Sequence, residues 1–163
     1  MKLAFSTLCC LDDSAEKVIS YALNGKIDGV ELRVNDKGET LNKCTAADAE
    51  SIRGLFSSAG VTVTDLALSC SLKEYDKKQL ETGKNGIDFA CALGVKGVRV
   101  FAGEHQTRFG DSVRVDFGGM VKALRELSEY GESRGVDVLV ETHSCYSSGR
   151  AMRQLIDAAE CDN

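Results

Sequence analysis

Along the chain, short segments in which apolar and polar residues alternate are each followed by a longer amphipathic segment. Alternation with a period of two is typical of strands, and apolar residues every three to four positions are typical of helices. We predict strands at 2–7, 27–34, 61–69, 97–103 and 136–142, and helices at about 13–24, 45–59, 77–93, 116–133 and 149–160. Strands that alternate with helices imply right-handed crossovers and a mainly parallel sheet.

Residues that favour helix ends flank the predicted helices. Asp12, Asp13 and Ser14 are N-cap candidates for the first helix, because their side-chain oxygens can accept hydrogen bonds from free backbone N–H groups. Glycines that can end a helix follow four of the helical stretches: Gly25, Gly60, Gly94 and Gly135. The positions of these capping residues therefore agree with the helix ends that the periodicity predicts.

Five strand–helix units in a single domain, 1–163, fit two folds. One is a flavodoxin-like open sheet, and the other is a partial TIM barrel made of the first five βα units of a (β/α)₈ barrel. Strands of an open doubly wound sheet are apolar on both faces. Here Val30 and Leu32 alternate with Glu31 and Arg33, and Arg99 has the same placement on the fourth strand. One polar face near the strand ends favours the barrel.

Composition excludes several classes of function. The net charge is −5 without a Lys/Arg cluster, which argues against nucleic-acid binding. We find no apolar run of about 18 residues, so we expect no membrane span. The seven cysteines are scattered and lack a C-x-x-C pair, which favours reduced thiols in a cytoplasmic protein.

Four segments together resemble one known family. KLAFST (2–7), DGVELR (28–33), GVRVFAG (97–103) and VLVETH (138–143) are similar, in order and spacing, to the xylose isomerase-like barrel family, which includes sugar-phosphate isomerases, epimerases and endonuclease IV relatives. The resemblance implies a (β/α)₈ barrel with a divalent metal, Mn²⁺, Mg²⁺ or Zn²⁺, at its C-terminal mouth. The implied reaction is isomerisation or epimerisation of a small sugar or sugar phosphate through an enediolate.

The resemblance also assigns roles to residues. Glu141 matches the carboxylate at the end of strand five, which in the family's epimerases binds the metal and transfers the proton. His143 matches a polar residue that faces the substrate. From their positions at the strand ends and in the loop after the fourth strand, further candidates for substrate binding are Glu31, Arg33, Arg99, His105 and Arg108. We also expect Glu31 and Arg33 to form a buried ion pair with Arg99.

The family barrel has eight strands, and residues 1–163 correspond to five of them. We therefore expect either a fragment or a shortened relative that lacks strands six to eight and their metal ligands. The alternative function is a catalytically silent module for binding or self-assembly, a homo-oligomer joined through the open edges of the barrel. The sequence leaves open which of the two holds, and also the sugar, the metal and the oligomeric state.

Overall fold

The computed structural model describes residues 1–34, 45–103 and 115–161, which form five strand–helix units. The strands are β1 (Ala4–Ser6), β2 (Gly29–Val34), β3 (Thr62–Leu72), β4 (Gly97–Ala102) and β5 (Asp137–Glu141). The helices are α1 (Ala15–Gly25), α2 (Ala49–Ser58), α3 (Lys77–Leu93), α4 (Phe117–Glu132) and α5 (Gly149–Ala159). Three short 3₁₀ turns are η1 (Thr7–Cys9), η3 (Ala46–Asp48) and η4 (Ser144–Tyr146). All ten predicted elements are present, with ends shifted by a few residues.

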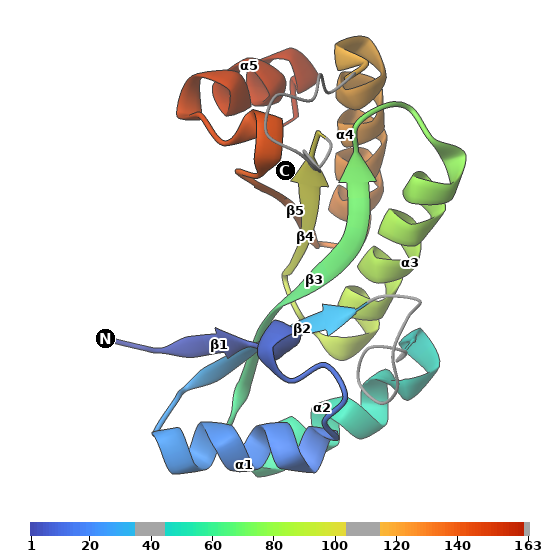
Figure 1. Ribbon diagram of the computed structural model, residues 1–163. Helices are drawn as coiled ribbons and strands as arrows, with labels where there is room; N and C mark the ends of the chain where they lie inside the picture. The colour runs from blue at the N-terminus through green and yellow to red at the C-terminus, as the bar shows by residue number, and fades with distance from the viewer. Residues whose placement is uncertain (35–44, 104–114, 162–163) are drawn as a thin grey trace.

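The order of the strands distinguishes the two folds. The sheet runs β1-β2-β3-β4-β5, and each neighbouring pair is parallel. A flavodoxin-like sheet would have the order 2-1-3-4-5 with helices on both faces. Here every strand lies beside its neighbour in sequence, and the helices lie along the outer side of a curved sheet (Figure 1). This is the arrangement of a partial TIM barrel, so the barrel prediction is confirmed.

The hydrophobic core lies between the sheet and the helices. Val30 and Leu32 on β2, and Val98 and Val100 on β4, are at most 1% exposed. Each fully buried aliphatic side chain of this size contributes about 1.5–3 kcal/mol to folding. The alternate positions on the same strands point to the concave side, which therefore holds the polar residues seen in the sequence. In the described chain, no helix is long and apolar enough to cross a membrane.

The helix ends follow the sequence with one correction. Ser14 is the N-cap of α1, and its hydroxyl accepts a hydrogen bond from the Lys17 N–H. Gly25 was expected to end α1, but it is the last residue of the helix, and the left-handed cap is Lys26 with φ of 54°. The Ile27 N–H then donates a hydrogen bond to the Ala22 carbonyl, so the helix ends one residue later than expected.

Two helical glycines give the first testable expectation. A Cβ added at Gly86 on α3 would overlap the terminal methyl carbons of Leu68, which is 1% exposed, whereas nothing lies within 4 Å of a Cβ at Gly54 on α2. We expect Gly86→Ala to lower the free energy of unfolding by about 1–3 kcal/mol. Gly54→Ala should raise it by about 0.5–1 kcal/mol, because alanine loses less backbone entropy in a helix. Urea denaturation measures both, and equal effects would contradict the α3–β3 contact.

Candidate functional site

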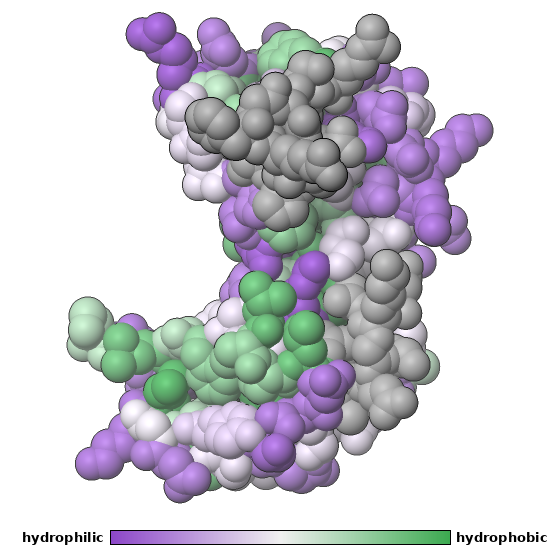
Figure 2. All heavy atoms as spheres, in the orientation of Figure 1, coloured by the Kyte–Doolittle hydropathy of each residue, from purple (hydrophilic) through white to green (hydrophobic). Residues whose placement is uncertain are grey.

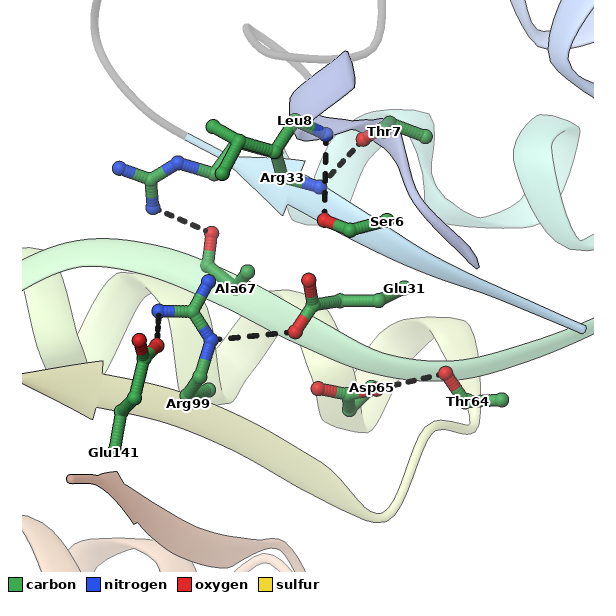
Figure 3. A network of polar contacts seen from close by, with 10 residues as sticks. All are labelled: Ser6, Thr7, Leu8, Glu31, Arg33, Thr64, Asp65, Ala67, Arg99 and Glu141. Atoms are coloured by element: carbon green, nitrogen blue, oxygen red, sulfur yellow. Dashed lines mark hydrogen bonds and ion pairs between the residues drawn. The ribbon is translucent and has the colours of Figure 1, made fainter. Parts of the chain in front are cut away.

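The centre of the concave face is Arg99, which bridges two carboxylates from different strands. Its Nε lies 3.2 Å from Glu31 Oε2 on β2, and its Nη1 forms an ion pair with Glu141 Oε2 on β5 (Figure 3). The Arg99 side chain is 14% exposed, that of Glu31 21% and that of Glu141 35%. The carboxylate most open to a ligand is therefore the one at the end of β5.

The register of the sheet explains why these side chains meet. Arg33, Ala67, Arg99 and Leu139 are successive partners across β2 to β5, so their side chains point to the same face. Ala67 is small and lies between the two arginines, which leaves space for both guanidinium groups. The pairing of β3 with each neighbour is irregular near this position. The register with β2 shifts between Val30 and Leu32, and the register with β4 shifts between Ala67 and Ser71.

A second carboxyl group, that of Asp65 on β3, lies beside Glu31. Burial favours the neutral form of Glu31, but the Ser6 hydroxyl and the charge of Arg99 outweigh it, so the pKa of Glu31 is below its ordinary value. Burial raises the pKa of Asp65, and the nearby charge of Glu31 raises it further, although Thr64 donates a 2.7 Å hydrogen bond. The two carboxyl groups therefore differ in proton affinity, and Asp65 is the protonated partner at acidic pH.

The raised pKa of Asp65 has a consequence for stability. The folded protein binds this proton more tightly than the unfolded chain, so Asp65 reduces stability as the pH rises above 3.8, the ordinary value. We expect Asp65→Asn, which replaces the carboxylate with a neutral amide that can donate a hydrogen bond to Glu31, to raise Tm at pH 7 by roughly 1–3 °C. The gain should shrink as the pH falls toward 3.8. A gain that is constant between pH 4 and pH 7 would contradict this explanation.

Arg33 lies beside Arg99 but does not join its ion pairs. Its Nη1 donates to the Ala67 carbonyl at 2.9 Å, and its Nη2 donates to the Ser69 hydroxyl at 2.6 Å. The expected ion pair among Glu31, Arg33 and Arg99 is thus correct for Glu31 with Arg99 and wrong for Arg33. Arg33 is two residues beyond Glu31 on β2, and its guanidinium reaches the Ala67 carbonyl and the Ser69 hydroxyl of β3 instead.

Two aromatic rings border the site. The rings of Phe101 on β4 and His143 after β5 form an edge-to-face pair with centroids 4.9 Å apart. The guanidinium carbon of Arg99 lies 4.8 Å from the Phe101 centroid, and that of Arg33 lies 5.8 Å from it. Phe101 therefore contacts both guanidinium groups and the histidine ring.

Most of the residues that the sequence predicts for the site lie close together in the structure. Glu31, Arg33, Arg99, Glu141 and His143 come together as one group, whereas His105 and Arg108 fall outside the described residues. Asp65, Phe101 and Ser69 were not among the predicted site residues. Asp65 had a visible signal, since it is the one charged residue in the apolar segment VTVTDLALS.

The carboxylates of the site are the candidate ligands for a divalent cation. Among the residues that the structure describes, no group of three or more His, Cys, Asp or Glu side chains could hold a metal ion. Glu141 is paired with a guanidinium, whose positive charge opposes a cation at the same oxygen atoms. The described residues by themselves therefore do not fit the metal that the family resemblance implies.

Comparisons with solved structures show the same fold in larger proteins. A xylose isomerase domain-containing protein from Salmonella typhimurium LT2 has a TM-score of 0.77 at 16% identity, covering 99% of this chain and 58% of that one. The 3-keto-D-glucoside 4-epimerase of E. coli has a TM-score of 0.75 at 16% identity, with coverages of 99% and 65%. A xylose isomerase-like TIM barrel protein from Mycobacterium smegmatis, in complex with magnesium, has a TM-score of 0.74 at 15% identity, with coverages of 99% and 62%.

These comparisons establish the fold and the family. The chain spans 58 to 65% of the length of the three structures. A search of curated proteins gave no significant match. The sequence profile described as "Xylose isomerase-like TIM barrel" matches residues 21–163, which is most of the chain. The chain therefore belongs to the xylose isomerase-like TIM-barrel family.

Proposed function

We propose that this chain forms part of an active site that moves a proton between carbon atoms of a small sugar or sugar derivative, as an isomerase or epimerase does. The observation that carries the proposal is the position of Glu141. It is a partly exposed carboxylate at the C-terminal end of β5, and Arg99 holds it on the concave face. This end of the strands is where barrels place their catalytic groups.

Glu141 acts as the acid–base group in this proposal. Its carboxylate takes the proton from a carbon next to a carbonyl group, and the electron pair left behind forms an enediolate. Return of the proton to the neighbouring carbon isomerises the sugar, provided that the hydroxyl proton also passes from the first oxygen atom to the former carbonyl oxygen. Return of a proton to the opposite face of the same carbon, from a second acid, epimerises the sugar while Glu141 keeps the proton that it removed. The Arg99 guanidinium keeps the carboxylate oriented and favours the negative charge that develops on the enediolate.

His143 and Phe101 supply contacts for the sugar. The Phe101 ring offers an apolar surface for the C–H groups of a sugar, and the His143 imidazole can bond a hydroxyl group. Both rings lie on the strands that carry Arg99 and Glu141, or directly after them, so their positions are set by the same register. Glu31 forms an ion pair with the Nε atom of Arg99 and so helps to hold the guanidinium in place.

A divalent cation enters the proposal only in a limited way. In this family fold, a bound metal supplies a positive charge that polarises the sugar's oxygen atoms. One of the similar structures is a magnesium complex. In this chain Glu141 would contribute one ligand only if it were released from Arg99, and the other ligands would have to come from outside the described residues. The roles assigned above to Glu141 and Arg99 do not depend on the cation.

Solvent exchange tests the proposed reaction directly. The protein would be incubated in D₂O with a panel of ketoses and their phosphates, with and without added Mn²⁺, and followed by ¹H NMR. We expect the C–H signal next to the carbonyl group to disappear for at least one sugar faster than in a buffer control. Absence of exchange across the panel, in both metal conditions, would overturn the proposal for this chain.

A second candidate function is self-association through the edges of the sheet. In the described residues, β1 and β5 each have a strand on one side only. Leu139 on β5 is 45% exposed on the concave face. Apolar side chains gather around β1 (Figure 2), and among them Leu3 is 50% and Leu8 57% exposed. Such edges and patches favour pairing with another chain. Light scattering behind size exclusion would show a dimer or larger species, and a soluble monomer at high concentration would count against it.

A further inference from the structure

The two arginines on the concave face differ in how their charges are balanced. Arg99 lies between Glu31 and Glu141, whereas the hydrogen-bond acceptors of Arg33 are the neutral Ala67 carbonyl and Ser69 hydroxyl. Within the described segments, no ion pair joins Arg33 to a carboxylate. Figure 3 shows its guanidinium directed at the Ala67 carbonyl oxygen, while the ion pairs of Glu31 and Glu141 both go to Arg99. Among the described residues, Arg33 is thus a half-buried charge without a direct counter-ion.

The position of Arg33 is fixed by its neighbours. Its backbone N–H donates to the Thr7 hydroxyl at 2.8 Å, and its side chain donates to β3 at the two atoms named above. A guanidinium has five N–H groups, so these two bonds leave three for a ligand. Because the side chain is already ordered, little conformational entropy is lost when an anion binds.

Holding this charge costs free energy in the absence of an anion. Burial lowers the pKa of Arg33, and the positive charge of Arg99 lowers it further, although Glu31 and Glu141 act in the opposite direction. A planar guanidinium matches the oxygen atoms of a carboxylate or a phosphate. We infer that Arg33 is the binding site for an anionic group, carboxylate or phosphate, on a small ligand of the concave face.

The location of Arg33 connects this anion site with the proposed reaction. The Phe101 ring centroid lies 5.8 Å from the guanidinium carbon of Arg33 and 4.8 Å from that of Arg99, and the ring also contacts His143. A ligand anchored at Arg33 would extend over Phe101 toward Glu141. The inference rests on the proposed function in one respect, since it names the substrate class as a sugar that carries one negative group.

Three matched six-carbon ligands test the inference: D-glucose, D-glucose 6-phosphate and the sugar acid D-gluconate. Binding would be measured at equilibrium by chemical-shift titration of the whole chain, so turnover is not required. We expect one or both anionic ligands to bind at least ~10-fold more tightly than glucose, with an affinity that falls as ionic strength rises. The tighter of the two identifies phosphate or carboxylate as the preferred group. Equal affinity for all three ligands, or no binding of any of them, would overturn the inference.

Variants separate a binding role from a structural one. Arg33→Gln should weaken the anionic ligands by about 10- to 100-fold and leave glucose unchanged, because a hydrogen bond to a charged group is lost. Arg33→Lys keeps the charge and should recover part of the loss, and it also decides the matter if Arg33→Gln does not fold. Arg53→Gln on the exposed side of α2 is the matched control and should have no effect. An equal loss for glucose in either Arg33 variant would show a structural role.

One further variant separates this inference from the proposed function. Glu141→Gln should retain anion binding while it loses solvent exchange. If anion binding disappears in Arg33→Gln but wild-type protein shows no exchange, the anion site stands and the isomerase proposal fails. If the wild-type protein shows exchange but binds the anionic ligands no more tightly than glucose, the isomerase proposal stands and the anion site fails.

Discussion

Glu141→Gln is expected to lower the rate of solvent proton exchange by about 10²–10⁴-fold, the contribution of a positioned acid–base group. Glutamine has nearly the same shape, and its carbonyl oxygen can still accept a hydrogen bond from Arg99, but it cannot accept a proton from carbon. The side chain should therefore stay in place while the chemistry is lost. The measurement is the NMR exchange assay at a fixed concentration of the responding sugar.

The matched control is Glu132→Gln, which makes the same chemical change at an exposed position of α4. Its exchange rate should equal that of the wild type. Glu141→Asp, which keeps the charge but retracts it by one methylene group, should give an intermediate rate because the carboxylate no longer reaches the same position. An unchanged rate in Glu141→Gln would remove this residue from the mechanism.

Arg99→Met should have the largest effect on stability of the polar substitutions. Methionine fills much of the same volume but leaves Glu31, Asp65 and Glu141 together without their central positive charge. Removing one partner of a buried ion pair costs about 3–5 kcal/mol, and the partial exposure of this cluster reduces the expected loss to roughly 2–4 kcal/mol. Urea denaturation at pH 7 measures the change in the free energy of unfolding.

The pH dependence of this loss identifies its cause. Without Arg99 the carboxylates repel one another, so their proton affinities rise and the folded state takes up protons at higher pH than the wild type does. The loss should therefore be greatest at neutral pH and shrink as the pH falls through about 5 to 4. Arg153→Met, at an exposed i,i+4 pair with Asp157, is the control and should leave the stability nearly unchanged, because solvent screens this pair. A loss at Arg99 that is the same at pH 4 and pH 7 would point to packing instead.

Much of the fold was predictable because its signals are local. The alternation of Val30 and Leu32 with Glu31 and Arg33 identified both the strand and its polar face. The order of the strands did not follow from any one segment. The open flavodoxin-like sheet and the barrel share the same βα pattern. The two folds were distinguished by the place of β1, which in the described sheet is an edge strand paired with β2, rather than a strand between β2 and β3.

The arrangement of the site was predictable only in part. Strand positions placed Glu31, Arg99 and Glu141 on one face, but not the separation of Arg33 from them. That separation depends on the register irregularities of β3, which determine where Ala67 and Ser69 lie relative to β2. A bulge changes the position of a whole strand without a strong mark in its own sequence. For the same reason the contact between Asp65 and Glu31 could not be predicted.

The consecutive strand order also bears on how the chain folds. Ala4 pairs with Gly29, and Gly97 pairs with Asp137, so strand partners lie 25 to 40 residues apart throughout the sheet. Each closure has a modest entropic cost, and none requires a distant segment to be made first. The sheet can therefore grow one unit at a time behind the ribosome, with each new helix covering the apolar side of the strand just added.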